Sequence, residues 1–213
     1  LLNIEYTSGT TGFPKGCMLG HDCWINMAMA TVENMRDDDV LMSAGAFYYL
    51  DAPIQLITSL ITGCTMVLCK KFTPSKFMET VHKHKATITL VPVAAMLLKE
   101  PEGPYNKNHN LRIMHYGALA PQLQKPLEER FGVRGLSNWG MTEIGVGLAV
   151  PVDVLDMTGS GTVGKPVGDR KFRIVDDDGK DVKQGEIGEL LVKGPALFRG
   201  YYKKEKETAD RFK

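Results

Sequence analysis

The segment from residue 6 to residue 16 reads YTSGTTGFPKG and combines three glycines, four serine or threonine hydroxyls and one lysine, Lys15. A glycine-rich loop after a strand exposes backbone N–H groups, hydroxyls add further donors, and a lysine adds positive charge, so this combination suits the phosphates of a nucleotide. It differs from the G-x-x-x-x-G-K-[ST] loop, because Pro14 precedes Lys15 and Gly16 follows it. A plain surface loop is the alternative for this segment taken alone.

A second candidate is the pair Thr142 and Glu143 within NWGMTE, where a hydroxyl and a carboxylate adjoin each other at the end of an expected strand. A carboxylate oxygen is a ligand that Mg²⁺ prefers. In isolation, without the flanking Trp139 and Gly140, the same pair is more typical of the start of a helix. The acidic runs at 36–40 and 175–179 lack the spacing of a calcium loop, and we expect them to be solvated turns.

Composition limits the possible partners of the chain. The 213 residues carry 26 basic and 25 acidic side chains, a net charge of +1, which excludes a strong electrostatic attraction to nucleic acid or to an anionic membrane. The four cysteines lack C-x-x-C spacing and favour reduced thiols over zinc. The uncharged stretch 52–69 is divided by Gly63 into a buried helix and a strand, so we expect no membrane span. The first residues of the sequence do not resemble a signal peptide, so the expected location is the cytoplasm.

Strands and helices alternate along the first 150 residues, which predicts an α/β fold with a mostly parallel sheet flanked by helices. From about Pro151, short strands between Gly- and Asp-rich turns predict a small antiparallel, barrel-like β unit. We therefore expect a nucleotide- and acyl-binding subdomain over 1–150 and the start of a β-rich subdomain over 151–213. The expected strands are 1–7, 40–44, 64–69, 86–91, 111–117 and 133–140, and the expected helices include 21–35, 52–62, 73–85 and 121–132.

The loop at 6–16 resembles the signature loop of the adenylate-forming superfamily, which includes acyl-CoA synthetases, luciferases and the adenylation domains of peptide synthetases. Four further segments resemble elements of that family in the family's order: HYGAL at 115–119, NWGMTE at 138–143, GTVGKP at 161–166, and residues 188–212. The resemblance covers essentially the whole chain. It implies a part of an ATP-dependent carboxylate–CoA ligase that uses ATP, Mg²⁺ and coenzyme A and acts on a small carboxylic acid.

The resemblance also implies roles for individual residues. The resemblance assigns catalysis to Lys15, Thr142 and Glu143, with Glu143 as the Mg²⁺ ligand. The nucleotide is assigned to Thr7, Ser8, Gly9, Thr10, Thr11, Gly12, Lys15, Gly117, Ala118, Leu119, Asn138, Trp139, Gly140, Met141 and Thr142. The acyl pocket is assigned to Tyr49, Tyr116 and Gly140, and the bulk of the two tyrosines predicts a short or polar acid.

Several alternatives remain open at this point. The same motifs fit an amino-acid adenylation domain, or a nucleotide-binding module without catalysis, and the acceptor of the acyl group could be CoA or the thiol of a carrier protein. Family members are longer, with a ribose-binding aspartate and a catalytic lysine beyond the region that matches this chain. We therefore expect the 213 residues alone to be inactive. The sequence does not indicate an oligomeric state.

Overall fold

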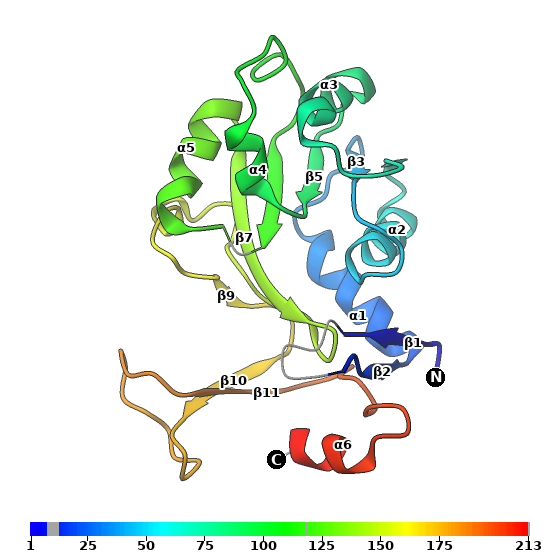
Figure 1. The fold of residues 1–213 in the computed structure, drawn as a ribbon, viewed down its shortest axis with the longest axis vertical. Coiled ribbons are helices and arrows are strands. Elements are labelled where there is room, and N and C mark those ends of the chain that lie inside the picture. Colours follow the sequence, from blue (N-terminus) through cyan, green and yellow to red (C-terminus); the bar gives the residue numbers. More distant parts are fainter. Residues whose placement is uncertain (8–12, 118, 213) are drawn as a thin grey trace.

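The computed structural model describes residues 1–7, 13–117 and 119–212. Its centre is a seven-stranded sheet in the order β4-β3-β5-β6-β7-β8-β9 (Figure 1). The first five strands in this order are parallel, and β8 and β9 are antiparallel additions at one edge. The bounds are β3 (Val40–Ser43), β4 (Thr65–Leu68), β5 (Ile88–Val91), β6 (Ile113–Gly117), β7 (Arg134–Met141), β8 (Gly145–Ala149) and β9 (Lys165–Pro166).

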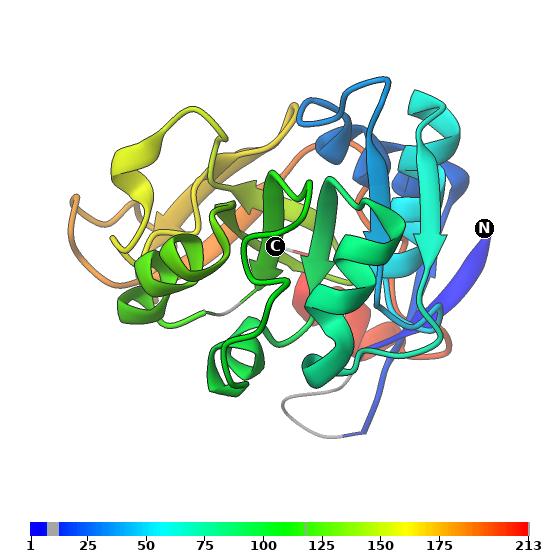
Figure 2. The ribbon, with the colours of Figure 1, turned by 90° about the horizontal axis from the view of Figure 1, so that it is seen from above.

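Helices cover both faces of this sheet. On one face lie α3 (Pro74–His84), α4 (Ala94–Lys99) and α5 (Pro121–Phe131), and α1 (His21–Val32) lies on the other (Figure 2). The helix α2 (Asp51–Thr62) packs against α1 and contacts β3 and β4. The main core cluster joins α3, α4 and α5 to side chains of β3, β5 and β6, among them Met42, Met114 and Tyr116. The predicted fold class, a mostly parallel sheet flanked by helices, is confirmed.

Helix boundaries follow the signals in the sequence. Gly63 ends α2 in the left-handed conformation (φ 74°), where its N–H donates to the carbonyl of Ser59. Gly132 ends α5 in the same conformation. Pro74 opens α3 because a proline at the first helical position lacks only an N–H that would have no helical partner. The uncharged stretch 52–69 is therefore α2 followed by β4, and no helix in the described part of the chain is long and apolar enough to cross a membrane.

Two small antiparallel sheets accompany the main one. In the first, β1 (Asn3–Tyr6) pairs with β2 (Gly16–Leu19), a strand that we did not expect from the sequence. The second consists of β10 (Lys171–Val175) and β11 (Glu189–Lys193) and lies in the region where we expected a barrel-like unit. The main sheet itself extends past residue 150, because β9 pairs with β8. The division into two subdomains at this point stays a prediction.

The β1–β2 hairpin is joined to the end of the chain. The N–H of Met18 donates to the carbonyl of Gly200 at 2.9 Å, and the N–H of Arg199 donates to the carbonyl of Met18 at 2.8 Å. The short helix α6 (Glu205–Arg211) follows, so the hairpin and α6 lie at the same end of the molecule as the end of β7 (Figure 1). This end gathers segments from the beginning, middle and end of the sequence.

Candidate active site

The hairpin β1–β2 carries the glycine-rich loop between its two strands. The loop is closed where the N–H of Thr7 donates to the carbonyl of Lys15 at 3.0 Å and the N–H of Lys15 donates to Oγ1 of Thr7 at 3.4 Å. Ser8, Gly9, Thr10, Thr11 and Gly12 lie outside the described residues, so their expected phosphate contacts stay predictions. The described ends nevertheless place Lys15 at the base of the loop.

Thr142 and Glu143 lie in the tight turn that joins β7 to β8, where the N–H of Ile144 donates to the carbonyl of Met141. The predicted location at the end of a strand is thus confirmed. The two strands approach so closely here that a Cβ added to Gly140 would lie 2.2 Å from the carbonyl oxygen of Gly145. A residue with a side chain at position 140 would therefore displace the turn, and with it the pair at 142 and 143.

Glu143 is buried, with 6% of its surface exposed, and its Oε1 accepts a hydrogen bond of 2.5 Å from the hydroxyl of Tyr201. The N–H of Phe198 donates to the carbonyl of Glu143, which fixes the backbone of the turn as well. Lys15 approaches the same tyrosine from the hairpin, with its Nζ 5.1 Å from the ring centroid. Tyr201 therefore lies between the cation and the carboxylate that we identified as catalytic from the sequence.

The side chains around this cluster are largely removed from water, and the carboxylates of Glu143 and Glu5 place negative charge near it. Burial raises the pKa of Tyr201 above its ordinary value, and the hydrogen bond to Glu143 raises it further. Burial, together with the charges of Glu143 and Glu5, raises the pKa of the Cys17 thiol to about 12. Cys17 is therefore a neutral core residue rather than a nucleophile. Lys15 is the positively charged side chain that the hairpin places near Glu143 and Glu5.

The chemistry of Glu143 suits a magnesium ion that arrives with a nucleotide. Only one of its carboxylate oxygens is engaged by Tyr201. Within the described residues no cluster of three or more His, Cys, Asp or Glu side chains could hold a metal by itself. Mg²⁺ is commonly held by one or two carboxylates together with the phosphates of a substrate, and a single available carboxylate fits this arrangement.

Residues expected to contact the purine lie at the carboxyl ends of β6 and β7. Gly117 and Asn138 are paired neighbours in these two strands, whereas Ala118 lies outside the described residues. Trp139 is half-buried and lies near Gly147. Leu119 turns its side chain into the core, so that only its backbone could face a nucleotide. The purine contacts themselves stay predictions.

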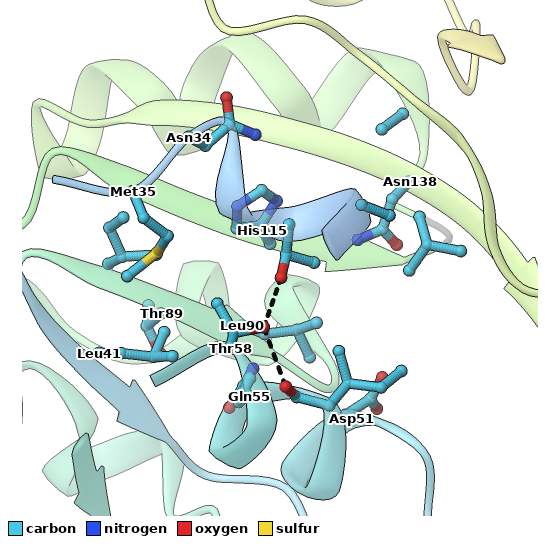
Figure 3. Close-up of a pocket in the computed structure, with 16 residues that line it drawn as sticks. Asn34, Met35, Leu41, Asp51, Gln55, Thr58, Thr89, Leu90, His115 and Asn138 are labelled. Atoms are coloured by element: carbon cyan, nitrogen blue, oxygen red, sulfur yellow. Dashed lines mark hydrogen bonds between the residues drawn. The ribbon is translucent and has the colours of Figure 1, made fainter. Parts of the chain in front are cut away.

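A cavity lies between the sheet and the helices α1 and α2 (Figure 3). Its volume is about 50 Å³, enough for a few water-sized groups. His115 of β6 and Asn138 of β7 border it on the sheet side, and Asp51 and Gln55 border it on the α2 side. The remaining lining residues are Ala30, Thr31, Asn34, Met35, Leu41, Ile54, Thr58, Ile88, Thr89, Leu90, Val146 and Ala149. The cavity thus adjoins strands β6 and β7, which also carry the candidate nucleotide residues.

The polar groups of the cavity fall into two classes. The hydroxyls of Thr31 and Thr58 are hydrogen-bonded to each other at 2.6 Å (Figure 3), and Thr89 donates to the carbonyl of Met42. By contrast, the side chains of four residues make no hydrogen bond with any other described residue. These are Asp51, Gln55, His115 and Asn138. The second class is available to a ligand.

His115 is neutral at physiological pH. Burial lowers its pKa to about 4, and the positive charge of Arg112 lowers it in the same direction. An uncharged imidazole offers one hydrogen-bond donor and one acceptor to whatever fills the cavity.

The two tyrosines that we expected in the acyl pocket do not line this cavity. The Tyr116 side chain is 1% exposed and belongs to the core shared with α3, α4 and α5. Side chains alternate along a strand, so Tyr116 and its neighbour His115 point to opposite faces of the sheet. Tyr49 is 54% exposed and does not line the cavity. Neither does Gly140, so the bulk of these residues does not set the size of this cavity.

Comparison with known proteins identifies the family. The model of the AMP-binding enzyme family matches residues 1–202. The chain belongs to the AMP-binding enzymes. The crotonobetaine/carnitine–CoA ligase of Salmonella typhimurium (strain LT2) is 34% identical over 220 residues, which cover 97% of this chain and 41% of that enzyme. This AMP-binding chain therefore spans less than half the length of that curated relative.

Solved structures of AMP-binding enzymes share its fold. ATP-bound MatB from Rhodopseudomonas palustris aligns with a TM-score of 0.88 and 28% identity over 99% of this chain and 42% of MatB. O-succinylbenzoate coenzyme A synthetase (MenE) from Bacillus subtilis, in complex with ATP and a magnesium ion, aligns with a TM-score of 0.85 and 26% identity, over 99% of this chain and 44% of MenE. The α/β sheet described above is thus the fold of this family.

Sequence reasoning missed Asp51, Gln55 and His115, which border the cavity, and Tyr201, which holds Glu143. One signal was available for His115, because the period of two along β6 places it on the face opposite Tyr116. No local signal marks Tyr201, which lies 58 residues after its partner.

Proposed function

We propose that the chain provides the nucleotide- and acyl-binding part of an ATP-dependent carboxylate–CoA ligase of the AMP-forming type. The convergence of Lys15, Tyr201 and Glu143 supports this proposal most directly. It brings a cation from the glycine-rich hairpin to the carboxylate of the β7–β8 turn. The cavity beside Asn138 supports it further, since it offers space for a short acid next to that turn's strand.

Two displacements make up the proposed reaction. In the first, a carboxylate oxygen of the acid attacks the α-phosphorus of ATP, the bond to the β-phosphate breaks, and pyrophosphate leaves with the bonding electrons. The product is an acyl-adenylate. In the second, the thiolate sulfur of CoA attacks the acyl carbon, and AMP leaves with the oxygen that came from the acid.

This chain's own residues would act by position and charge. Lys15 neutralises phosphate charge, and the hydroxyl of Thr142, which has no partner among the described residues, donates to a phosphate oxygen. Glu143 would hold Mg²⁺, which neutralises phosphate charge when bound with ATP. Tyr201 holds the carboxylate of Glu143 in place. The cavity excludes bulk water from one side of the acid.

The products distinguish this reaction from other uses of ATP. The complete gene product that contains these residues is incubated with ATP, Mg²⁺, CoA and a panel of short acids, and nucleotides and thioesters are quantified by mass spectrometry. We expect AMP, pyrophosphate and thioester in equal amounts. Formation of ADP and phosphate, or binding of ATP without any acid-dependent AMP, would contradict the proposal. The second result would instead support a nucleotide-binding module.

A further inference from the structure

The short helix α6 brings an arginine, Arg211, to the turn that carries Glu143. Nη2 of Arg211 lies 3.6 Å from Sδ of Met141, the last residue of β7, although the two residues are 70 positions apart. Arg211 is exposed, and its guanidinium forms no ion pair with any of the described residues. A positive charge without a counter-ion in the described part of the chain therefore lies beside the β7–β8 turn.

Contacts on both sides of Arg211 hold α6 in this place (Figure 1). Oγ1 of Thr208 accepts a hydrogen bond of 2.9 Å from the N–H of Tyr201. The ring of Phe212 stacks on that of Phe198, with the centroids 5.1 Å apart and the planes at 11°. Phe198 in turn meets the ring of Tyr201 at a centroid distance of 4.9 Å. The helix is thus joined to the segment that contacts the catalytic turn.

The charge of Arg211 acts on the same cluster as the charge of Lys15. Burial raises the pKa of the Tyr201 hydroxyl, and the positive charge of Arg211 opposes this shift. Burial also raises the pKa of the Cys17 thiol, and the charges of Lys15 and Arg211 both oppose that shift. One cation from the hairpin and one from α6 therefore approach the site proposed for the nucleotide.

The position of Arg211 indicates which part of ATP it would meet. In the proposed displacement, the attacking and leaving oxygens lie roughly in line on opposite sides of the α-phosphorus. An acid that comes from the cavity beside Asn138 therefore directs pyrophosphate away from that cavity, toward the hairpin and solvent. Arg211 is exposed at the end of the molecule that carries the hairpin. A guanidinium can bind two phosphate oxygens at once, which suits this part of the nucleotide.

We propose that Arg211 binds the pyrophosphate portion of ATP, as a second cation beside Lys15. This inference rests on the proposed function, because it concerns the leaving group of the first displacement. The alternative is a structural role, in which Arg211 only packs α6 against β7. Loss of a structural contact would weaken the binding of every nucleotide alike, so the two roles can be separated by experiment.

The test compares a nucleotide that has the pyrophosphate portion with one that lacks it. Binding of Mg²⁺–ATP and of AMP to the complete gene product is measured by calorimetry, for the unaltered protein and for Arg211→Gln. Glutamine removes the charge, so the Kd of Mg²⁺–ATP should rise by about tenfold or more, and the Kd of AMP should change by less than about twofold. Arg211→Lys keeps the charge without the planar fork and should give an intermediate Kd for Mg²⁺–ATP. An equal rise for AMP, or an unchanged Kd of Mg²⁺–ATP in Arg211→Gln, overturns the inference.

Arg36→Gln is the matched control. Arg36 is also an exposed arginine, and it precedes β3 at the opposite end of the sheet. Both Kd values should be unchanged in this variant. An increase in the Kd of Mg²⁺–ATP equal to that of Arg211→Gln would show a general effect of surface charge and would overturn the inference.

A second measurement needs no variant. Phenylglyoxal modifies guanidinium groups, and peptide mass spectrometry measures the labelling of Arg211 in the unaltered gene product. Mg²⁺–ATP should slow this labelling several-fold, and AMP should not. Equal labelling with and without Mg²⁺–ATP, in a protein that forms acid-dependent AMP, overturns the inference while the ligase function stands. If the unaltered protein does not bind Mg²⁺–ATP, both proposals fall.

Discussion

The hydroxyl of Tyr201 donates a hydrogen bond to the carboxylate of Glu143, although the two residues are 58 positions apart. Both are buried, and the ring of Tyr201 also faces the Nζ of Lys15. This contact connects the glycine-rich hairpin, the β7–β8 turn and the segment before α6. It makes the orientation of a carboxylate that would hold Mg²⁺ depend on a residue outside both motifs.

Tyr201→Phe removes the hydroxyl and keeps the ring that faces Lys15. A hydrogen bond to a charged group contributes about 1.5–3 kcal/mol, so we expect acyl-adenylate formation to slow by about tenfold or more. The Mg²⁺ concentration needed for half-maximal rate should rise, because Glu143 loses the contact that orients it. Rapid-quench kinetics at saturating Mg²⁺ measure the first effect, and the same kinetics over a Mg²⁺ series measure the second.

Tyr202→Phe is the matched control for this prediction. Tyr202 is the next residue and is exposed, and its hydroxyl has no partner among the described residues. Its loss should change neither quantity. Equal behaviour of the two variants would show that the contact with Glu143 has no role in orienting the carboxylate.

Lys15→Ala and Thr142→Val should each slow adenylation while leaving the affinity for the acid nearly unchanged. Each removes a contact that strengthens as charge develops on the phosphate, and losing one such donor typically costs about 3 kcal/mol of transition-state stabilisation. Single-turnover rates and equilibrium titration with the acid separate the two effects. Lys206→Ala, in the exposed part of α6, serves as the control. Unchanged single-turnover rates would remove both residues from the site.

His115 should make the stability of the protein depend on pH in the mildly acidic range. Because burial lowers its pKa from 6.5 to about 4, the unfolded chain binds more protons than the folded one between these values. Its contribution to stability is complete above pH 6.5 and is lost as the pH falls toward 4. The full loss amounts to at most about 3 kcal/mol.

Urea unfolding at neutral pH and near the lower pKa measures this dependence. His115→Gln should lose less stability on acidification than the unaltered protein does, whereas His84→Gln, at the exposed end of α3, should behave like the unaltered protein. The same pH dependence in His115→Gln would show that other groups are responsible.

Asp39 should stabilise the opposite end of the sheet from the candidate site. It is 3% exposed and accepts hydrogen bonds from Arg112, from the hydroxyl of Thr87 and from the N–H of Arg36. Burial alone would raise its pKa, but these bonds and the charge of Arg112 lower it overall. Its contribution is therefore present above the ordinary pKa of a carboxyl and is lost as the pH falls through the lowered value.

Asp39→Asn should reduce the free energy of unfolding at neutral pH by about 3 kcal/mol, because Arg112 then lies without its counter-ion. Chemical denaturation measures the loss, and the difference between the two proteins should shrink in acid. The neighbouring exposed Asp38→Asn is the control and should change stability little. A similar loss in both variants would contradict the assigned role of the buried pair.

The elements of the fold were accessible from the sequence where a local signal sets them. Gly63 and Gly132 end their helices in the left-handed conformation that favours glycine, and Pro74 begins α3, as expected. Asp39 was interpreted as solvated within an acidic run, but the structure buries it against Arg112, which lies 73 residues later. That pairing depends on which strands are neighbours in the sheet, and the local pattern of charges does not contain this information.

In the candidate site, too, some residues could be predicted from the local sequence and others could not. The motifs around Lys15 and Glu143 were found because their residue types lie close together in the chain. Tyr116 packs in the core on the face opposite His115, and its motif alone does not show this because the alternation of side chains along β6 was not considered. Asp51 was overlooked because one acid at the start of a helix is ordinary, and only the packing of α2 against the sheet places it beside a cavity.

The central claim is that an oxygen of the acid attacks the α-phosphorus of ATP, and oxygen-18 in the carboxyl group of the acid tests it directly. The complete gene product is supplied with the labelled acid, ATP, Mg²⁺ and CoA, and the nucleotide and pyrophosphate are analysed by mass spectrometry. An acyl-adenylate intermediate transfers one labelled oxygen to AMP and none to pyrophosphate. Unlabelled AMP, or label in phosphate released together with ADP, would contradict the account.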